Sequence, residues 1–151
     1  MEKILIVLEG VSNSGKTTTL NKLIKLLENK NKIRLIDKEK KDDNIFSNEN
    51  MNDIRCIFEY TLSNNTVLTI GIATGGDTEK IVSDNIEYFN KNNCDIMINA
   101  TKSKGKTVDY IHKFIKNNKN ITFLPFYKAT NKEEHDEKLA QDILKTIFKY
   151  V

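Results

Sequence analysis

One stretch near the N-terminus constrains the fold of this chain more than any other. Ile4–Leu8 is a short, wholly apolar run, and Gly10–Thr17 after it holds two glycines among mostly polar residues. Apolar residues then return at helical spacing, at Leu20, Leu23, Ile24 and Leu27. Such a run is typical of a strand buried on both faces of a parallel sheet, and the later spacing marks one helix face. The sequence therefore predicts a strand, a glycine loop and a helix in direct succession.

The rest of the chain repeats this alternation of strand-like and helix-like patterns. Further strands are expected at Ile33–Ile36, Ile54–Leu62, Thr66–Ala73, Cys94–Ile98 and Ile121–Phe126. Helical spacing occurs within residues 82–89, 108–115 and 140–151. The turn residues at 63–65 lie between two strand-like runs and predict an antiparallel hairpin. We expect a single domain over residues 1–151, an α/β fold built as a three-layer α/β/α sandwich with a mostly parallel sheet.

The predicted topology also indicates where a ligand binds. Right-handed crossovers bring the carboxyl ends of parallel strands to one edge of the sheet, and ligands bind at that edge. It is expected to collect the loops that follow Leu8, Asp37, Ala73, Ile98 and Phe126.

The loop Gly10–Thr17 matches the pattern G-x-x-x-x-G-K-[ST] at every specified position. After a strand and before a helix, its backbone amides and the helix N-terminus form a cradle for phosphate oxygens. Lys16 supplies a charge for the β- and γ-phosphates, and the Thr17 hydroxyl is placed to bind Mg²⁺. The candidate nucleotide-binding residues are Gly10, Asn13, Ser14, Gly15, Lys16, Thr17 and Thr18. The sequence thus predicts that the chain binds a nucleoside triphosphate with Mg²⁺.

This motif and its strand-loop-helix setting resemble the P-loop nucleoside triphosphate hydrolase superfamily. The compact alternation of strands and helices resembles the nucleotide and small-molecule kinase branch of that superfamily. The resemblance implies a P-loop fold and a partner carboxylate at the end of a strand, the Walker B role.

Two aspartates compete for that role. Asp37 follows the apolar run Ile33–Ile36 and is the candidate Mg²⁺ ligand beside Thr17, whereas Asp77 follows two glycines at the same predicted edge. Each is a candidate catalytic residue, with Lys16, and can orient Mg²⁺-bound water or act as a base toward a substrate hydroxyl. The alternatives are a surface residue for Asp37 and a helix N-cap for Asp77. Glu9 is a further candidate base because it directly precedes the loop.

Basic residues refine the choice of substrate. Thr101–Thr107 contains three lysines around a glycine and is either a clamp for an anionic acceptor or a solvated basic loop. The sequence has only two arginines, Arg34 and Arg55, which disfavours a nucleoside monophosphate kinase because such enzymes bind phosphates through several arginines. No N-K-x-D motif follows the last predicted strand, so ATP is favoured over GTP.

Composition excludes several other classes of protein. The 24 basic and 21 acidic residues are interspersed, which argues against a nucleic-acid partner. No apolar run reaches the length of about 18 residues that a membrane span needs. Cys56 and Cys94 lie far apart and form no metal or redox motif, so a reducing, cytoplasmic setting is expected.

Two functions remain open at this point. The first is a phosphotransferase that moves the γ-phosphoryl group of ATP to a small-molecule acceptor. The second is an ATP-binding switch or slow NTPase that controls a protein partner.

Overall fold

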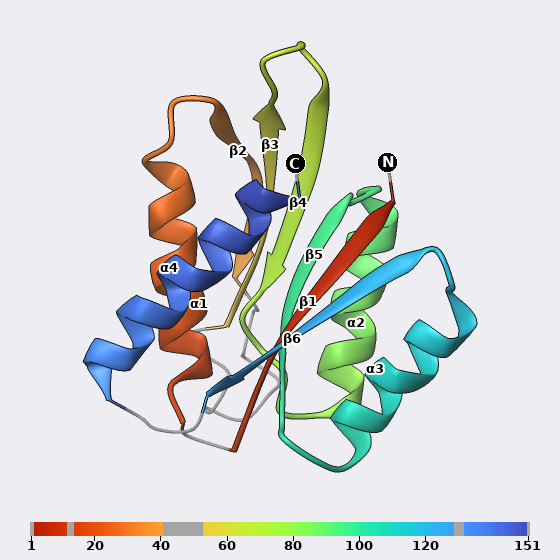
Figure 1. Cartoon of the computed structure of the whole chain (residues 1–151). Coiled ribbons are helices and arrows are strands. Elements are labelled where there is room, and N and C mark those ends of the chain that lie inside the picture. Colours follow the sequence, from red (N-terminus) through yellow and green to blue (C-terminus); the bar gives the residue numbers. More distant parts are fainter. Residues whose placement is uncertain (1, 12–13, 41–52, 129–131, 151) are drawn as a thin grey trace.

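The computed structural model describes residues 2–11, 14–40, 53–128 and 132–150. These residues form six strands and four helices (Figure 1). The strands are β1 Lys3–Gly10, β2 Ile33–Lys40, β3 Ile54–Thr61, β4 Val67–Ala73, β5 Ile96–Thr101 and β6 Ile121–Lys128. The helices are α1 Lys16–Glu28, α2 Glu79–Lys91, α3 Lys106–Asn117 and α4 Glu133–Lys149.

The strands form one sheet in the order β2-β3-β4-β5-β1-β6. Strand β1 lies between β5 and β6 and is parallel to both, and β4 is parallel to β5. Strand β3 is antiparallel to both of its neighbours, β2 and β4, so the predicted hairpin and the mostly parallel sheet are confirmed. All strands except β3 therefore end at the same edge, which lies at the bottom of Figure 1.

Helices cover both faces of this sheet (Figure 1). On one face α1 and α4 pack over a core that includes Leu8, Leu23 and Ile143. On the other face α2 and α3 pack over a core that includes Val7 and Phe89. Successive side chains of a strand point to opposite faces, so β1 supplies both cores, and every residue of Ile4–Leu8 is buried. The layered α/β architecture expected from this run is confirmed.

The second strand is longer than its sequence pattern predicts. β2 was expected to end at Asp37 but continues to Lys40, with Lys38 paired to Cys56 and Glu39 to Arg55. Pairing with β3 satisfies the backbone of these residues whatever their side chains, and polar side chains are tolerated because β2 lies at the edge of the sheet. No helix in the described part of the chain is long and apolar enough to cross a membrane.

Candidate functional site

The loop between β1 and α1 has the geometry that its sequence pattern requires at its second glycine. Gly15 is the N-cap of α1, with φ 93° and ψ 20°. This left-handed conformation strains residues that carry a Cβ, which explains a glycine directly before Lys16. Asn13, one of the candidate binding residues, lies outside the described residues. Ser14 lies within the loop, and its buried hydroxyl has no hydrogen-bonding partner among the described residues.

Lys16 lies folded over the loop rather than extended into solvent. Only 6% of its side chain is exposed, and Nζ donates hydrogen bonds to the carbonyl oxygens of Gly10 at 2.6 Å and Val11 at 3.4 Å. Burial lowers the pKa of Lys16, while the nearby carboxylate of Asp77 acts in the opposite direction. The cation is thus held at the mouth of the loop by neutral carbonyl oxygens, which an anion can replace.

Asp77 is the carboxylate that the fold brings to this lysine. Its Oδ1 lies 3.8 Å from Lys16 Nζ, and the two residues follow β4 and β1, which are separated in the sheet by β5. The alternative interpretation of Asp77 as a helix N-cap is wrong. Thr78 is the N-cap of α2, and its Oγ1 accepts a hydrogen bond from the Ile81 amide at 3.1 Å.

The turn before Asp77 depends on close packing at a glycine. A Cβ at Gly76 would collide with the carbonyl oxygen of Ala100 at the end of β5. The turn therefore passes against β5 at a distance that only glycine allows. This contact directs the chain across β5 toward the loop that holds Lys16.

Thr17 faces the end of β4 as well. Its Oγ1 donates to the carbonyl oxygen of Thr74 at 3.3 Å, and the Thr74 hydroxyl accepts from the Ile54 amide at 2.9 Å. These contacts join the first turn of α1 to the start of the segment that carries Asp77.

The loop and the segment after β4 enclose one pocket of about 260 Å³, here called the phosphate pocket. Its lining residues are Ser14, Gly15, Lys16, Thr17, Thr18, Asp53, Thr74, Gly75, Gly76 and Asp77. Every described member of the predicted nucleotide-binding set lines it except Gly10, which ends β1 and accepts the Lys16 hydrogen bond. Charged and hydroxyl groups from three separate parts of the sequence therefore converge on one pocket.

Asp37 is placed elsewhere. It lies on β2, separated from β1 by three strands, and it is not among the residues that line the phosphate pocket. Its Oδ2 accepts a hydrogen bond from the Tyr88 hydroxyl of α2 at 2.7 Å. Burial and this hydrogen bond raise the pKa of Tyr88. The structure does not bring Asp37 together with Thr17, because β2 does not end at Asp37.

Asp53 is a pocket residue that the sequence pattern did not reveal. It lies directly before β3 and lines the phosphate pocket, and a Cβ at Gly75 would come within 2.6 Å of its Oδ2. Its position at the end of a long polar stretch offered no local signal.

The oxygen donors of the phosphate pocket suit Mg²⁺. The Thr17 hydroxyl and the carboxylates of Asp77 and Asp53 are hard ligands, and Mg²⁺ typically uses one or two carboxylates together with water and phosphate. No group of three or more His, Cys, Asp and Glu side chains able to hold a metal occurs among the described residues. The described residues therefore offer no site for a metal bound by such side chains alone. The phosphate pocket fits Mg²⁺ that is bound together with a phosphate chain.

Glu9, the third candidate carboxylate, is not among the residues that line the phosphate pocket. It lies on the same side of β1 as Val7, toward α3, and is 7% exposed. Burial raises its pKa, and the nearby His112 opposes that shift. Its paired neighbours are Thr101 on β5 and Tyr127 on β6.

The lysine loop after β5 lies at the predicted edge. Lys102 is near enough to lower the pKa of Lys16, and its amide donates to Thr107 Oγ1 at 3.1 Å. None of the lysines at 102, 104 and 106 lines the phosphate pocket. The structure therefore supports an electrostatic influence of this loop and no direct contact.

A buried ion pair stabilises the start of α1, directly after the loop. Lys128 Nζ and Asp136 Oδ1 lie 2.6 Å apart, with side chains only 1% and 4% exposed. Thr19 of α1 donates to the same carboxylate oxygen at 3.2 Å. This group ties the first turn of α1 to β6 and α4, and nothing in the local sequence predicted it.

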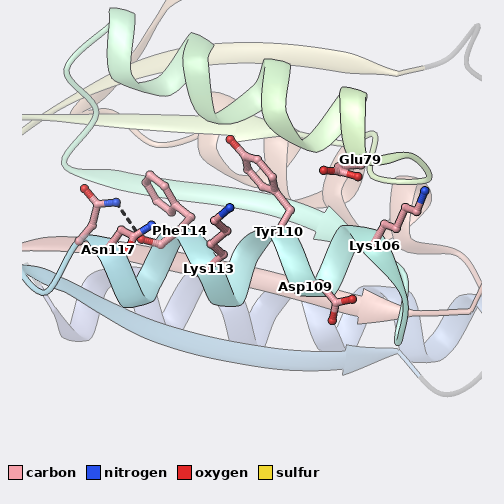
Figure 2. A pocket seen from close by; sticks show the side chains of 8 residues that line it. Glu79, Lys106, Asp109, Tyr110, Lys113, Phe114 and Asn117 are labelled. Carbon is pink, nitrogen blue, oxygen red and sulfur yellow. Dashed lines mark hydrogen bonds between the residues drawn. The ribbon is translucent and has the colours of Figure 1, made fainter.

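A larger pocket, of about 430 Å³, lies beside α3 and lacks this convergence. Figure 2 shows Tyr110 and Phe114 directed into it from α3, with Glu79 of α2 at one end. Basic and acidic side chains alternate around it. Of the described residues near the edge where the parallel strands end, those that reach this pocket lie at the starts of α2 and α3. The phosphate pocket is therefore the better candidate site.

The chain matched no protein-family model, no curated protein and no solved structure. The site must therefore be interpreted from its own residues.

Proposed function

We propose that this chain binds Mg-ATP through Gly10–Thr17 and transfers the γ-phosphoryl group to a small-molecule acceptor, on a fold of the P-loop type. The observation that carries the proposal is the phosphate pocket itself. It combines a left-handed glycine at a helix start, a buried lysine, a threonine hydroxyl and a facing carboxylate. This is the set of groups that a triphosphate with Mg²⁺ requires.

The start of α1 supplies the donors for the phosphate chain. The first intrahelical bond runs from the Thr19 amide to the Gly15 carbonyl at 2.9 Å. The amides of Lys16, Thr17 and Thr18 precede it and have no acceptor within the helix. These three amides and the positive end of the helix bind phosphate oxygens, and Lys16 exchanges its carbonyl acceptors for the terminal phosphates.

Mg²⁺ would be held by Thr17 and by Asp77, which takes the Walker B role. When bound, Mg²⁺ neutralises charge on the phosphate oxygens. Replacement of the Thr17–Thr74 hydrogen bond by this interaction costs little, since a bond of 3.3 Å to a carbonyl is weak.

The transfer is a displacement at the γ-phosphorus. An acceptor hydroxyl oxygen forms a bond to phosphorus while the bond to the β,γ-bridging oxygen breaks, and that electron pair leaves with ADP. The hydroxyl proton passes to Asp53, the other carboxylate of the phosphate pocket, because Asp77 is bound to Mg²⁺. Lys16 stabilises the charge that develops on the transferring group. The products are a phosphate ester, ADP and a proton.

ATP is proposed over GTP because residues 126–129 read Phe-Tyr-Lys-Ala where a guanine-specific motif would carry its aspartate. A reducing, cytoplasmic setting agrees with two buried free thiols, at Cys56 and Cys94.

Lys16→Ala tests the proposal most directly. We expect loss of Mg-ATP binding by calorimetry, together with a nearly unchanged thermal transition of the nucleotide-free protein. Lys25→Ala is the matched control, because Lys25 is an exposed lysine of the same helix. Unaltered ATP affinity in Lys16→Ala would contradict the assignment.

A nucleotide-dependent switch is the second candidate. It is favoured by the contact of Thr17 with Thr74, because ligand binding at Thr17 would release the backbone that leads to Asp77. ADP release from Mg-ATP, measured alone and with pooled small molecules, separates the two functions. Acceleration by one pool supports the phosphotransferase, and tight binding with slow, acceptor-independent release supports the switch.

A further inference from the structure

A second, smaller pocket adjoins the phosphate pocket. It has a volume of about 20 Å³ and is lined in part by Arg55 and Glu39. Asp53 and Gly75 line both pockets. Because the two pockets share these residues, groups bound in them would lie next to each other.

Arg55 is the unusual residue of this small pocket. Its side chain is 21% exposed, whereas that of Arg34, the only other arginine in the sequence, is 77% exposed. Arg34 forms an ordinary surface ion pair with Glu59 at 2.9 Å. A largely buried guanidinium keeps its charge and its five N–H donors, so its partners decide what it can bind.

A fully buried amide holds Arg55 in place. Arg55 Nε donates to Asn85 Oδ1 at 2.7 Å, and Asn85 is 1% exposed. Asn85 Nδ2 in turn donates to the Gly75 carbonyl at 2.9 Å and to Asn99 Oδ1 at 2.6 Å. The same amide therefore fixes both the guanidinium and the turn that leads to Asp77.

The outer nitrogens of Arg55 are available to a ligand. Nη1 donates to Glu39 Oε1 at 3.2 Å, and the Glu39 side chain is about half exposed. Nη2 has no hydrogen-bonding partner among the described residues. An exposed carboxylate contributes little to such an ion pair and is readily replaced by a bidentate oxyanion.

We propose that Arg55 binds an anionic group of the acceptor, a carboxylate or a phosphate, and so holds the acceptor's hydroxyl group at the phosphate pocket. The transfer itself rests on the proposed function, whereas anion binding does not require nucleotide. A pocket of about 20 Å³ holds roughly one water-sized group, so only an oxygen of the anion enters it, and the rest of the acceptor lies in the phosphate pocket beside Lys16. The acceptor class is therefore a small organic anion that carries a hydroxyl group.

Turnover with three pools of compounds tests this specificity. The pools are hydroxy acids, phosphorylated hydroxyl compounds, and neutral sugars and nucleosides. We expect one anionic pool to accelerate ADP release from Mg-ATP, and Arg55→Gln to reduce that acceleration by about tenfold or more, as loss of a bidentate contact does. The responding pool distinguishes carboxylate from phosphate. Acceleration by the neutral pool alone, by no pool, or equally in Arg55→Gln would overturn the proposal.

Two further variants guard against a purely structural effect. Arg34→Gln removes the exposed arginine and should leave the acceleration unchanged. Glu39→Gln removes the competing carboxylate without touching Asn85, and it should lower the KM for the anionic acceptor severalfold. An unchanged KM in Glu39→Gln would count against the site even if Arg55→Gln failed to fold.

Anion binding is also measured without nucleotide. The Lys16→Ala change removes the lysine of Gly10–Thr17, so that this loop contributes less to anion binding. Thermal unfolding of this variant is then followed with millimolar malonate or inorganic phosphate. We expect one anion to raise the midpoint by a few degrees, and the added Arg55→Gln change to abolish the rise. If the anion raises the midpoint equally in the two proteins, or in neither, the anion site is overturned even if the wild-type protein binds Mg-ATP. A rise that depends on Arg55, in a protein whose wild type binds no Mg-ATP, supports the anion site and overturns only the proposed function.

Discussion

Asp37 and Asp77 look alike in the sequence and differ in the structure. Each comes after an apolar run in the sequence, and β2 and β4, to which these runs belong, point toward the same edge of the sheet. Asp77 lies 3.8 Å from Lys16, whereas Asp37 lies within an edge strand and binds the Tyr88 hydroxyl. A strand followed by an aspartate therefore does not define a site. What matters is where the strand stops and where the following turn leads.

A single substitution at Gly76 disrupts the turn that positions Asp77. Gly76→Ala places a methyl group against the Ala100 carbonyl, a backbone atom that cannot move aside without shifting β5. We expect a loss of about 3 kcal/mol in the free energy of unfolding, at the upper end of overpacking effects. Chemical denaturation measures the loss. A change within about 0.5 kcal/mol would show that the turn relaxes without β5.

The second test compares the two aspartates directly. Asp77→Asn should reduce ADP release from Mg-ATP by about 100-fold, because the carboxylate facing Lys16 and Thr17 is lost. Asp37→Asn keeps an oxygen acceptor for Tyr88 and should change the rate by less than about twofold. Steady-state rates at saturating Mg-ATP decide the matter. Equal losses in both variants, or a larger loss in Asp37→Asn, would reverse the assignment.

The smallest expected effect concerns Glu9, the carboxylate buried beside the loop. Burial raises its pKa in the folded protein, so the folded state binds a proton more tightly than the unfolded state. The free energy of unfolding should therefore fall as the pH rises from the unfolded value near 4.5 to the folded pKa, and then level off. Glu9→Gln should remove this dependence.

Urea titrations at pH 4 and pH 8 measure the effect of Glu9. The stabilisation by Glu9→Gln relative to wild type should be larger at pH 8 than at pH 4, because only the wild-type protein loses stability as the buried carboxyl group ionises. Equal differences at both pH values would mean that His112 offsets the burial of the carboxylate.

The strands, the helices and the glycine loop between β1 and α1 were for the most part predictable from the amino-acid sequence. The apolar run Ile4–Leu8 and the helical spacing after it led to a strand and a helix, and 63–65 led to a hairpin, all confirmed. The residue before Lys16 adopts a left-handed conformation, which agrees with a glycine at that position. These features are local: periodicity, turn residues and glycine act over a few neighbouring positions.

Tertiary structure alone decided which side chains meet in the site. Thr17 reaches Thr74 across 57 positions of sequence, and Thr19 reaches Asp136 across 117. Asp77 was distinguished from Asp37 only by the strand order, which brings the segment after β4 close to Lys16 and leaves β2 at the edge of the sheet. Arg55 was identified only by its hydrogen bond to the buried Asn85. Such contacts depend on strand order and on loop paths, which follow from packing of the whole sheet. Local pattern carries no information on them because every strand with a polar end looks the same until its neighbours are fixed.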